Sequence, residues 1–336
     1  MKSSDGERDM PGKKGKGSDN PAPVHKSNRL GELKISLKAR LRGMQYSLFL
    51  LRKSRLSVIG FAIVMIMIFI ALIAPLIATF FLPHDQLPPP YANPLRIPRD
   101  YNVTAPLPPG SPGHPLGTGQ FGTDIYYGLV YGAQVSMRMA IVVVGIGFLI
   151  GILLGAISGY FGGVIDEIVM RVTDVFLSVP FLILAMAVVV VMGPGLDNIM
   201  MAFIIVWWPG YARLVRGQVL SIRENVYIEA ARAIGSSNSR IIFRHILPNS
   251  FAPIIVNATM DMGTIVLVTA GLSYIGFGAE PGTAEWGRMV SDGQQYFIAG
   301  AWWMVVFPGL MIMLFVLGFN LMGDGLRDIL DPKLRK

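Results

Sequence analysis

The sequence predicts an all-α polytopic membrane protein with six transmembrane helices. Its 336 residues are 52% hydrophobic and 15% charged, which is far too apolar for a soluble globular chain of this length. The formal charge is +8; fourteen of the 29 Lys and Arg residues precede Val58, and most of the others lie in loops expected to be cytoplasmic. Because cytoplasmic loops are enriched in Lys and Arg, this charge indicates membrane orientation, with lipids and not nucleic acid as the partner.

The segments before the first span are expected to be cytoplasmic. Residues 1–28 are rich in Lys, Gly, Ser, Pro and Asp and predict a disordered tail, because they cannot bury a core. In residues 29–57 leucines recur every three or four positions, as in an amphipathic helix lying on the inner leaflet. Residues 58–82 are predicted to form the first transmembrane helix, since this run is too long and too far from the N-terminus for a cleaved signal peptide. With six spans, both termini are then cytoplasmic.

Residues 83–133 are predicted to form an extracytoplasmic segment. Its many prolines between Pro83 and Pro115 favour extended chain over helix. His114 lies near the end of this proline-rich stretch, and we interpret it as a structural loop residue in preference to a ligand.

Residues 134–325 are predicted to form a core of five further spans. The second span, at about 134–158, is associated with four glycines at strict four-residue spacing. These are Gly147, Gly151, Gly155 and Gly159. Such a ridge of small residues lets another helix approach closely, so we expect it to be a helix-packing surface.

The third span is predicted to run from Asp166 to about Met192, with a kink at Pro180. Its start carries Arg171 and Asp174 at near-helical spacing. These two residues belong either to a gate or contact with another subunit, or to a solvated helix start with local ion pairs, and the second interpretation is favoured.

The last three spans are predicted near 198–213, 251–277 and 302–320, and residues 326–336 then form a cytoplasmic C-terminus. The fifth span holds Asp261. An ionisable side chain within a span is costly to expose to lipid, so Asp261 is a candidate for the transport pathway or for polar helix packing.

The polar, basic segment 221–249 lies between the fourth and fifth spans and is the main candidate site. Glu229, Ala230 and Ala231 are helix formers, and Gly235 followed by polar residues predicts a bend into a second short helix. That second helix is expected to end at Leu247-Pro248. Small alanines beside one carboxylate suit insertion into a groove of a partner protein. The alternative is an ordinary amphipathic loop on the membrane surface.

This pattern resembles the EAA loop of the membrane-spanning subunits of binding-protein-dependent ABC importers. The match rests on Glu229-Ala230-Ala231, Gly235 after three further residues, and the Leu247-Pro248 ending. Three further segments resemble the dipeptide, oligopeptide and nickel branch of that family: His114 to Thr118, Gly271 to Gly278, and Gly323 to Asp328. The chain departs from the branch pattern at Gly119 and Gln134.

The resemblance implies an ABC type I importer permease fold and half of a translocation pathway. The implied partners are a homologous second permease subunit, two ABC ATPase subunits and an extracytoplasmic solute-binding protein. ATP and Mg would be bound by the ATPases, because the run at Gly12 to Ser18 lacks the Gly-Lys-Ser/Thr ending of a phosphate loop. No catalytic or metal residues are therefore expected in this chain.

The implied substrates are di- or oligopeptides, with oligosaccharides or nickel as alternatives within the same architecture. A secondary transporter is a weaker alternative, because the sequence has no evident inverted repeat and few charges near the middle of its spans.

Overall fold

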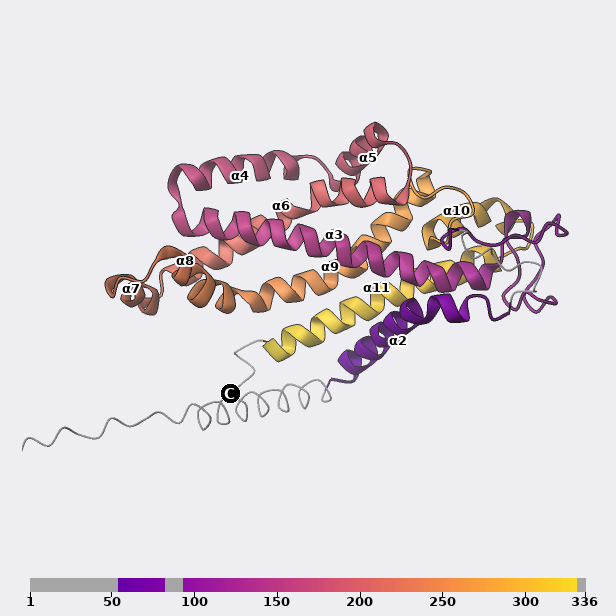
Figure 1. The fold of residues 1–336 in the computed structure, drawn as a ribbon, viewed down its shortest axis with the longest axis horizontal. Coiled ribbons are helices and arrows are strands. Elements are labelled where there is room, and N and C mark those ends of the chain that lie inside the picture. The colour runs from indigo at the N-terminus through magenta and orange to yellow at the C-terminus, as the bar shows by residue number, and fades with distance from the viewer. Residues whose placement is uncertain (1–53, 82–92, 331–336) are drawn as a thin grey trace, which may run out of the picture. The chain divides into compact units, whose positions relative to one another are not determined.

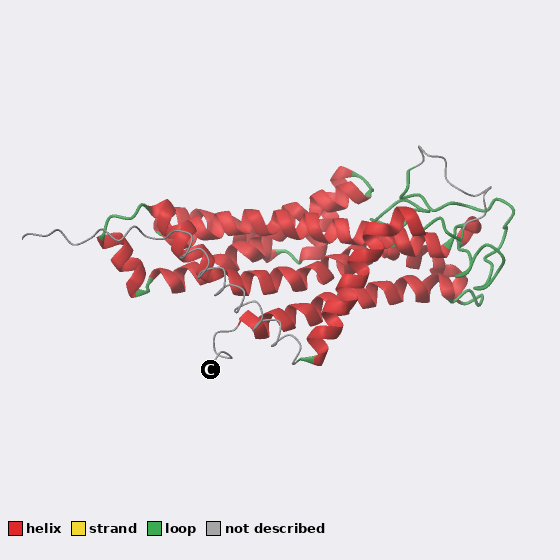
Figure 2. Cartoon of the chain, turned by 60° about the horizontal axis from the view of Figure 1, so that its bottom comes forward, coloured by secondary structure: helices red, strands yellow, loops and turns green. Residues whose placement is uncertain are grey.

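The computed structural model describes residues 54–81 and 93–330, and helices dominate this part of the chain (Figures 1 and 2). The longer helices, in chain order, are α2 (Arg55–Ile77), α3 (Ile125–Phe161), α4 (Gly163–Ser178), α5 (Phe181–Met192), α6 (Leu196–Arg223), α9 (Leu247–Ile275), α10 (Trp286–Phe297) and α11 (Trp303–Leu330). The shorter ones are the 3-10 turn η2 (Gln120–Gly122), α7 (Val226–Ala233), α8 (Asn238–Ile241) and the π-helical η3 (Ile242–Ile246). Within these described ranges the β-contacts are isolated bridges without strands. The predicted tail at 1–28 and nearly all of the predicted amphipathic helix at 29–57 lie outside them.

The predicted fold class is confirmed. Helices α2, α3, α6 and α11, together with the continuous helical stretch Asn238–Ile275, are each long and apolar enough to cross a membrane. Helices α4 and α5 meet the same test only as a pair, which would make a sixth span.

The predicted third span is broken and not merely kinked at Pro180. Helices α4 and α5 are bent by 89° to one another. Val179 is extended, and Pro180 occupies the N-cap position of α5. A proline disfavours the helical conformation at the residue before it, so α4 ends ahead of Val179 and α5 starts in a new direction.

Helix α3 has 37 residues and is longer than the predicted span at 134–158. It begins after Asp124, whose carboxylate accepts a hydrogen bond from the backbone N–H of Tyr127 at 2.7 Å. It ends at Phe161, where Gly162 and Gly163 both have positive φ and reverse the chain into α4. At about 1.5 Å per residue, α3 is roughly 55 Å long and extends beyond a hydrocarbon core.

The glycine ridge of α3 lies against α6. A Cβ atom at Gly155 would lie 2.5 Å from the carbonyl oxygen of Ala212, and one at Gly159 would lie 3.0 Å from that of Arg216. A Cβ at Gly151 would overlap the side chain of Tyr211. The backbones of α3 and α6 are therefore close enough that a side chain at these positions would have to push them apart.

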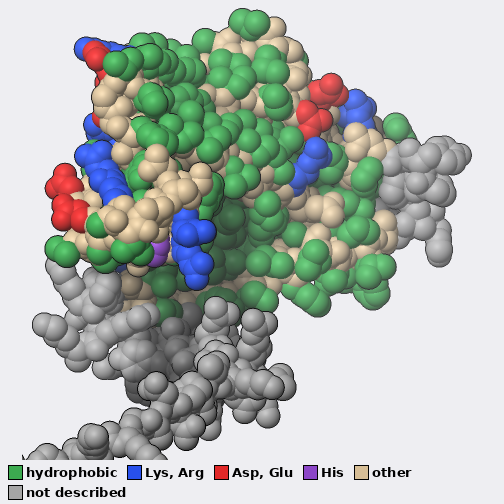
Figure 3. All heavy atoms as spheres, turned by 60° about the vertical axis from the view of Figure 1, so that its left-hand side comes forward, with side chains coloured by type: hydrophobic (Ala, Val, Ile, Leu, Met, Phe, Trp, Pro, Cys, Tyr) green, Lys and Arg blue, Asp and Glu red, His purple; other side chains and the backbone are tan. Residues whose placement is uncertain are grey.

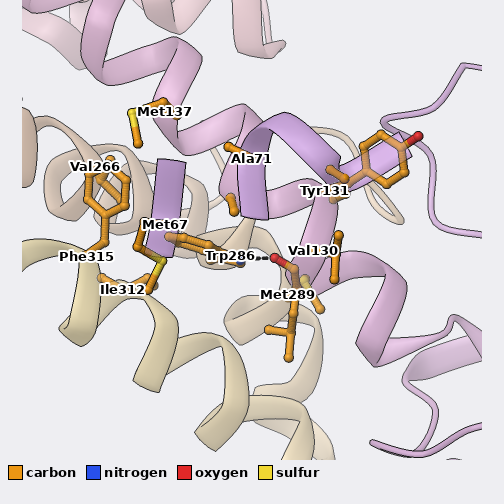
Figure 4. Close-up of a cluster of buried hydrophobic side chains, with 14 of the residues drawn as sticks. Met67, Ala71, Val130, Tyr131, Met137, Val266, Trp286, Met289, Ile312 and Phe315 are labelled. Atoms are coloured by element: carbon orange, nitrogen blue, oxygen red, sulfur yellow. Dashed lines mark hydrogen bonds between the residues drawn. The ribbon is translucent and has the colours of Figure 1, made fainter. Parts of the chain in front are cut away.

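A buried hydrophobic cluster around Trp286 packs α10 against α2, α3, α9 and α11 (Figure 4). The indole N–H of Trp286 donates to the carbonyl of Leu129 on α3 at 3.1 Å, and its ring packs near Phe315 of α11. No helix was predicted between the spans near 251–277 and 302–320, so α10 is a feature that sequence reasoning missed. Its N-cap Glu285 accepts hydrogen bonds from the N–H groups of Gly287 and Arg288, so the helix start is locally encoded.

His114 is buried at the same end of the helical unit. Its Nδ1 lies 2.7 Å from Oδ2 of Asp124, and its Nε2 lies 3.7 Å from Oδ2 of Asp100. These contacts tie the extended segment to the start of α3. The structural role predicted for His114 agrees with this arrangement.

Candidate functional site

The candidate site is built on α7, which is amphipathic. Ile228 and Ala231 face inward and join a buried cluster formed with α3, α6 and α9. Glu229 and Ala230 are exposed. The prediction that both alanines present a close-approach surface to a partner is therefore wrong for Ala231. Ala231 lies three residues after Ile228 and so falls on the same inward side of the helix, whereas Ala230 is turned about 100° away from it.

The exposed side of α7 is apolar with one carboxylate. We call it the α7 outer face and define it as Val226, Tyr227, Glu229, Ala230 and Ile234. Val226 is 79% exposed and Ile234 83% exposed. Figure 3 brings this end of the helical unit forward and shows Arg side chains among apolar ones. Large apolar side chains gathered on an otherwise polar loop mark a contact surface.

The bend after α7 is a left-handed helix cap. Gly235 has φ +79°, and its N–H donates to the carbonyl of Arg232 at 2.9 Å. The next N–H, of Ser236, reaches back to the carbonyl of Ala231 at 3.0 Å. This pair of bonds forms a Schellman motif, whose C′ position is usually glycine because it requires positive φ. The predicted bend at Gly235 is thus present.

The second short helix does not end at Pro248 as predicted. Leu247 and Pro248 instead form the first turn of α9, and the helix runs on from α8 through η3 without a break. In η3 the N–H of Leu247 donates to the carbonyl of Ile242, one residue further back than in an α-helix. This π-type register accommodates the missing N–H of Pro248. Ser250 Oγ also donates to the carbonyl of Ile246 at 2.8 Å.

The α7–α8 loop is anchored on the end of α3. The hydroxyl of Tyr160 donates to Oδ1 of Asn238 at 2.8 Å, and the guanidinium of Arg232 lies over the Tyr160 ring at 5.3 Å. Arg223, at the end of α6, donates to the carbonyls of Gly159 and Tyr160. Sequence reasoning missed these anchoring residues, because partners from different helices leave no local pattern.

The charged residues of α4 form separate ion pairs. Arg171 lies 3.7 Å from Glu167 on its own helix, and both are exposed. Asp174 instead accepts from Arg213 of α6 at 2.5 Å. The structure therefore brings neither residue to the α7 outer face.

A bidentate ion pair between Asp166 and Arg216 links α4 to α6, and no local sequence pattern indicates it. Asp166 accepts two bonds from Arg216, Nε to Oδ1 at 2.5 Å and Nη2 to Oδ2 at 2.6 Å. Ser158 Oγ also donates to Oδ1 at 2.5 Å, so three elements meet at one carboxylate.

Asp261 lies apart from the α7–α8 loop, in the apolar part of α9. The indole N–H of Trp207 on α6 donates to its Oδ2 at 3.3 Å. In residues 54–81 and 93–330 no three His, Asp or Glu side chains converge so as to hold a metal ion.

Two family models match the chain. Residues 151–336 match the binding-protein-dependent transport system inner membrane component. Residues 44–92 match the N-terminal transmembrane domain of oligopeptide transport permease C.

Individual relatives cover most of the chain. A dipeptide transport system permease protein, DppC, of Alkalihalophilus pseudofirmus is 44% identical over 289 residues, covering 85% of this chain and 88% of the relative. The probable D,D-dipeptide transport system permease protein DdpC of Escherichia coli is 42% identical, with 85% and 90% covered. A solved chain of the MetNI methionine ABC transporter in an inward-facing conformation aligns with a TM-score of 0.50 and 25% identity, covering 61% of this chain and 97% of that one.

Proposed function

The chain belongs to the family of binding-protein-dependent transport system inner membrane components, and from that premise we propose that it forms half of the pathway of an ATP-driven importer of short peptides. The partners in this proposal are a homologous permease, two ABC ATPases that bind ATP and Mg, and an extracytoplasmic solute-binding protein. Relatives named for dipeptide, D,D-dipeptide, di/tripeptide and glutathione transport support short peptides as the substrate class.

The α7 outer face is the observation that carries the proposal. It combines exposed apolar side chains with the carboxylate of Glu229 on a helix of eight residues. A cleft on an ATPase subunit that accepts such a helix would bury the apolar side chains and pair Glu229 with a cation. The apolar contact supplies affinity, and the charge pair fixes the register of the helix.

Movement of α7 would be transmitted to the membrane-spanning helices through two connections. One is the contact of Arg232 and Asn238 with Tyr160 at the end of α3. The other is the continuous helical stretch Asn238–Ile275, which joins the loop directly to a span. Closure of the ATPases on ATP would therefore tilt α3 and α9 together and switch the pathway between its two faces.

The direct test uses the purified assembly in lipid. The ATPase rate is measured with the binding protein loaded with a dipeptide, with an oligosaccharide, with nickel, or empty. We expect stimulation by the dipeptide alone. Stimulation by only the sugar or only nickel would assign the chain to that substrate instead, and uptake that needs no ATPase would overturn the proposal.

A charge reversal tests the role of the α7 outer face. In the Glu229→Lys chain we expect normal membrane insertion but loss of ATP-driven uptake, because an unfavourable charge at an interface costs about 2 kcal/mol or more, roughly 30-fold in affinity. Glu224→Lys is the matched control, since Glu224 is also exposed but precedes α7. Uptake by the Glu229→Lys chain equal to that of the control would show that α7 does not dock through Glu229.

A further inference from the structure

Asp261 is at the centre of a polar cluster between α6 and α9 whose hydrogen bonding is incomplete. Its Oδ2 accepts one long hydrogen bond, 3.3 Å, from Trp207. Tyr211, one turn along the same helix as Trp207, is 2% exposed. Its hydroxyl faces the carboxylate of Asp261 and interacts with it. A carboxylate can accept about four hydrogen bonds, so Trp207 and Tyr211 leave room at Asp261 for a further polar group.

The charge of Asp261 is also uncompensated among the described residues. No cation there lies within ion-pair distance of it, and the next two arginines along α6 are engaged elsewhere. Arg213 pairs with Asp174, and Arg216 pairs with Asp166. A carboxylate inside a membrane span is stable only with a cation or water beside it. A cation is a group that would complete the cluster and compensate the charge of Asp261.

A cavity of about 390 Å³ lies one helical turn from this cluster, whose three side chains are not themselves part of its lining. It is lined by Leu214, Ala252, Pro253, Val256, Asn257, Met260, Arg327 and Leu330. Met260 directly precedes Asp261, and Asn257 lies one helical turn before it. Sites for small ligands begin at about 300 Å³, so the cavity suits a molecule of few residues. It also carries the guanidinium of Arg327, and the region thus offers one anion and one cation.

We propose that Asp261 binds the terminal ammonium group of the peptide as it passes between α6 and α9. This inference rests on the proposed function, because it assigns a recognition group to the same transport pathway. The Trp207 and Tyr211 side chains position the carboxylate, and the aromatic surface beside it favours an ammonium ion through cation–π attraction. Neither indole nor phenol is a preferred ligand for nickel, which binds imidazole readily, so the cluster suits an organic cation.

The test uses the absence of cysteine from the chain. In the Asn257→Cys chain, assembled with its partners in lipid nanodiscs, a water-soluble thiol reagent reports access to the cavity. We expect a dipeptide to slow labelling severalfold and its N-acetylated form to have no effect. Adding Asp261→Asn should abolish the protection, whereas adding Asp261→Glu should retain part of it. Ser239→Cys, on exposed α8, is the control for reagent reactivity and should be labelled equally with and without peptide.

The outcomes separate this inference from the proposed function. Protection that persists with Asp261→Asn, or equal protection by the N-acetylated dipeptide, overturns the role of Asp261. A cavity that is not labelled, or is labelled without protection, overturns it too. In each case dipeptide uptake by the unaltered assembly is measured in parallel. If the assembly takes up dipeptide but dipeptide does not slow the labelling, only the role of Asp261 is refuted. If there is no ATP-driven uptake, the proposed function is refuted.

Discussion

Gly235 is required by the direction in which the chain turns after α7, and not by crowding. Its φ is +79°, yet a Cβ atom there would meet no heavy atom within 4 Å. An L-residue in the left-handed region costs about 1–2 kcal/mol, less for Asn and more for a β-branched side chain. We expect Gly235→Val to impair ATP-driven uptake and Gly235→Asn to retain most of it.

The measurement for Gly235 is the number of peptides imported per ATP hydrolysed in proteoliposomes. Gly217→Ala is the matched control, because Gly217 lies within α6 with open space around it and without positive φ. Normal coupling in the Gly235→Val chain would show that the bend is not needed.

Glu285 predicts a pH dependence of stability. Burial raises the pKa of its carboxyl above the usual 4.5, although hydrogen bonds from Ser273 and from the N–H groups of Gly287 and Arg288 oppose the rise. The folded chain therefore holds this proton at pH values where the unfolded chain has released it. Stability then falls as pH rises from 4.5 through the folded pKa, and the loss is complete above that pKa.

The side chain introduced by Glu285→Gln does not ionise, so the variant lacks this pH dependence. Its thermal midpoint should therefore rise relative to the unaltered chain as pH increases through that window, whatever constant offset the altered cap adds. Glu280→Gln is the control, because Glu280 lies in the same loop but is exposed. A difference between the two chains that stays constant with pH would contradict the prediction.

At the scale of elements, the α3–α6 contact predicts opposite effects for one substitution in one helix. Gly155→Ala places a methyl group 2.5 Å from the carbonyl oxygen of Ala212, so α6 must shift, and overpacking of this kind costs about 1–3 kcal/mol. Gly145→Ala, also on α3, meets open space and gains the better helix propensity of alanine. We expect the thermal midpoint in detergent to fall with Gly155→Ala and to hold or rise with Gly145→Ala. Equal midpoints would mean that the ridge is not a tight contact.

Spans and bends were predictable because each depends on a local property. Apolar length predicted the five helices that are each long enough to span, although the third predicted span is broken at Pro180. The turn after α7 was predictable from Gly235 alone, because glycine readily adopts positive φ. Helix ends were less predictable, since α9 continues through Pro248 only because the π-helical segment and the side chain of Ser250 absorb the loss of a backbone bond. The inward face of Ala231 and the anchor at Tyr160 depend on neighbours distant in sequence. No local pattern encodes such contacts.

At the scale of the whole molecule, charge is distributed unevenly between the two ends of the helical unit. The stretch from Arg213, in the last part of α6, to Arg244, just before α9, carries six arginines and two carboxylates. These are Arg213, Arg216, Arg223, Arg232, Arg240 and Arg244, with Glu224 and Glu229. The opposite end holds α10 and residues 93–124, where cations and carboxylates are balanced: Arg96 and Arg99 against Asp100 and Asp124 (Figure 1). The excess of arginine favours the cytoplasmic side for α7.

This asymmetry predicts the orientation that docking to an ATPase requires. Single cysteines are introduced at exposed positions of the cysteine-free chain: Thr104→Cys in the extended segment, Ser239→Cys in α8 and Asp328→Cys near the end of α11. A membrane-impermeant maleimide applied to intact cells, or to spheroplasts where a wall blocks access, should label only the Thr104→Cys chain. Permeabilised cells should give labelling of all three, which controls for reactivity. The reverse pattern would place α7 outside the cell, where no ATPase could reach it, and the coupling role of Glu229 would then be untenable.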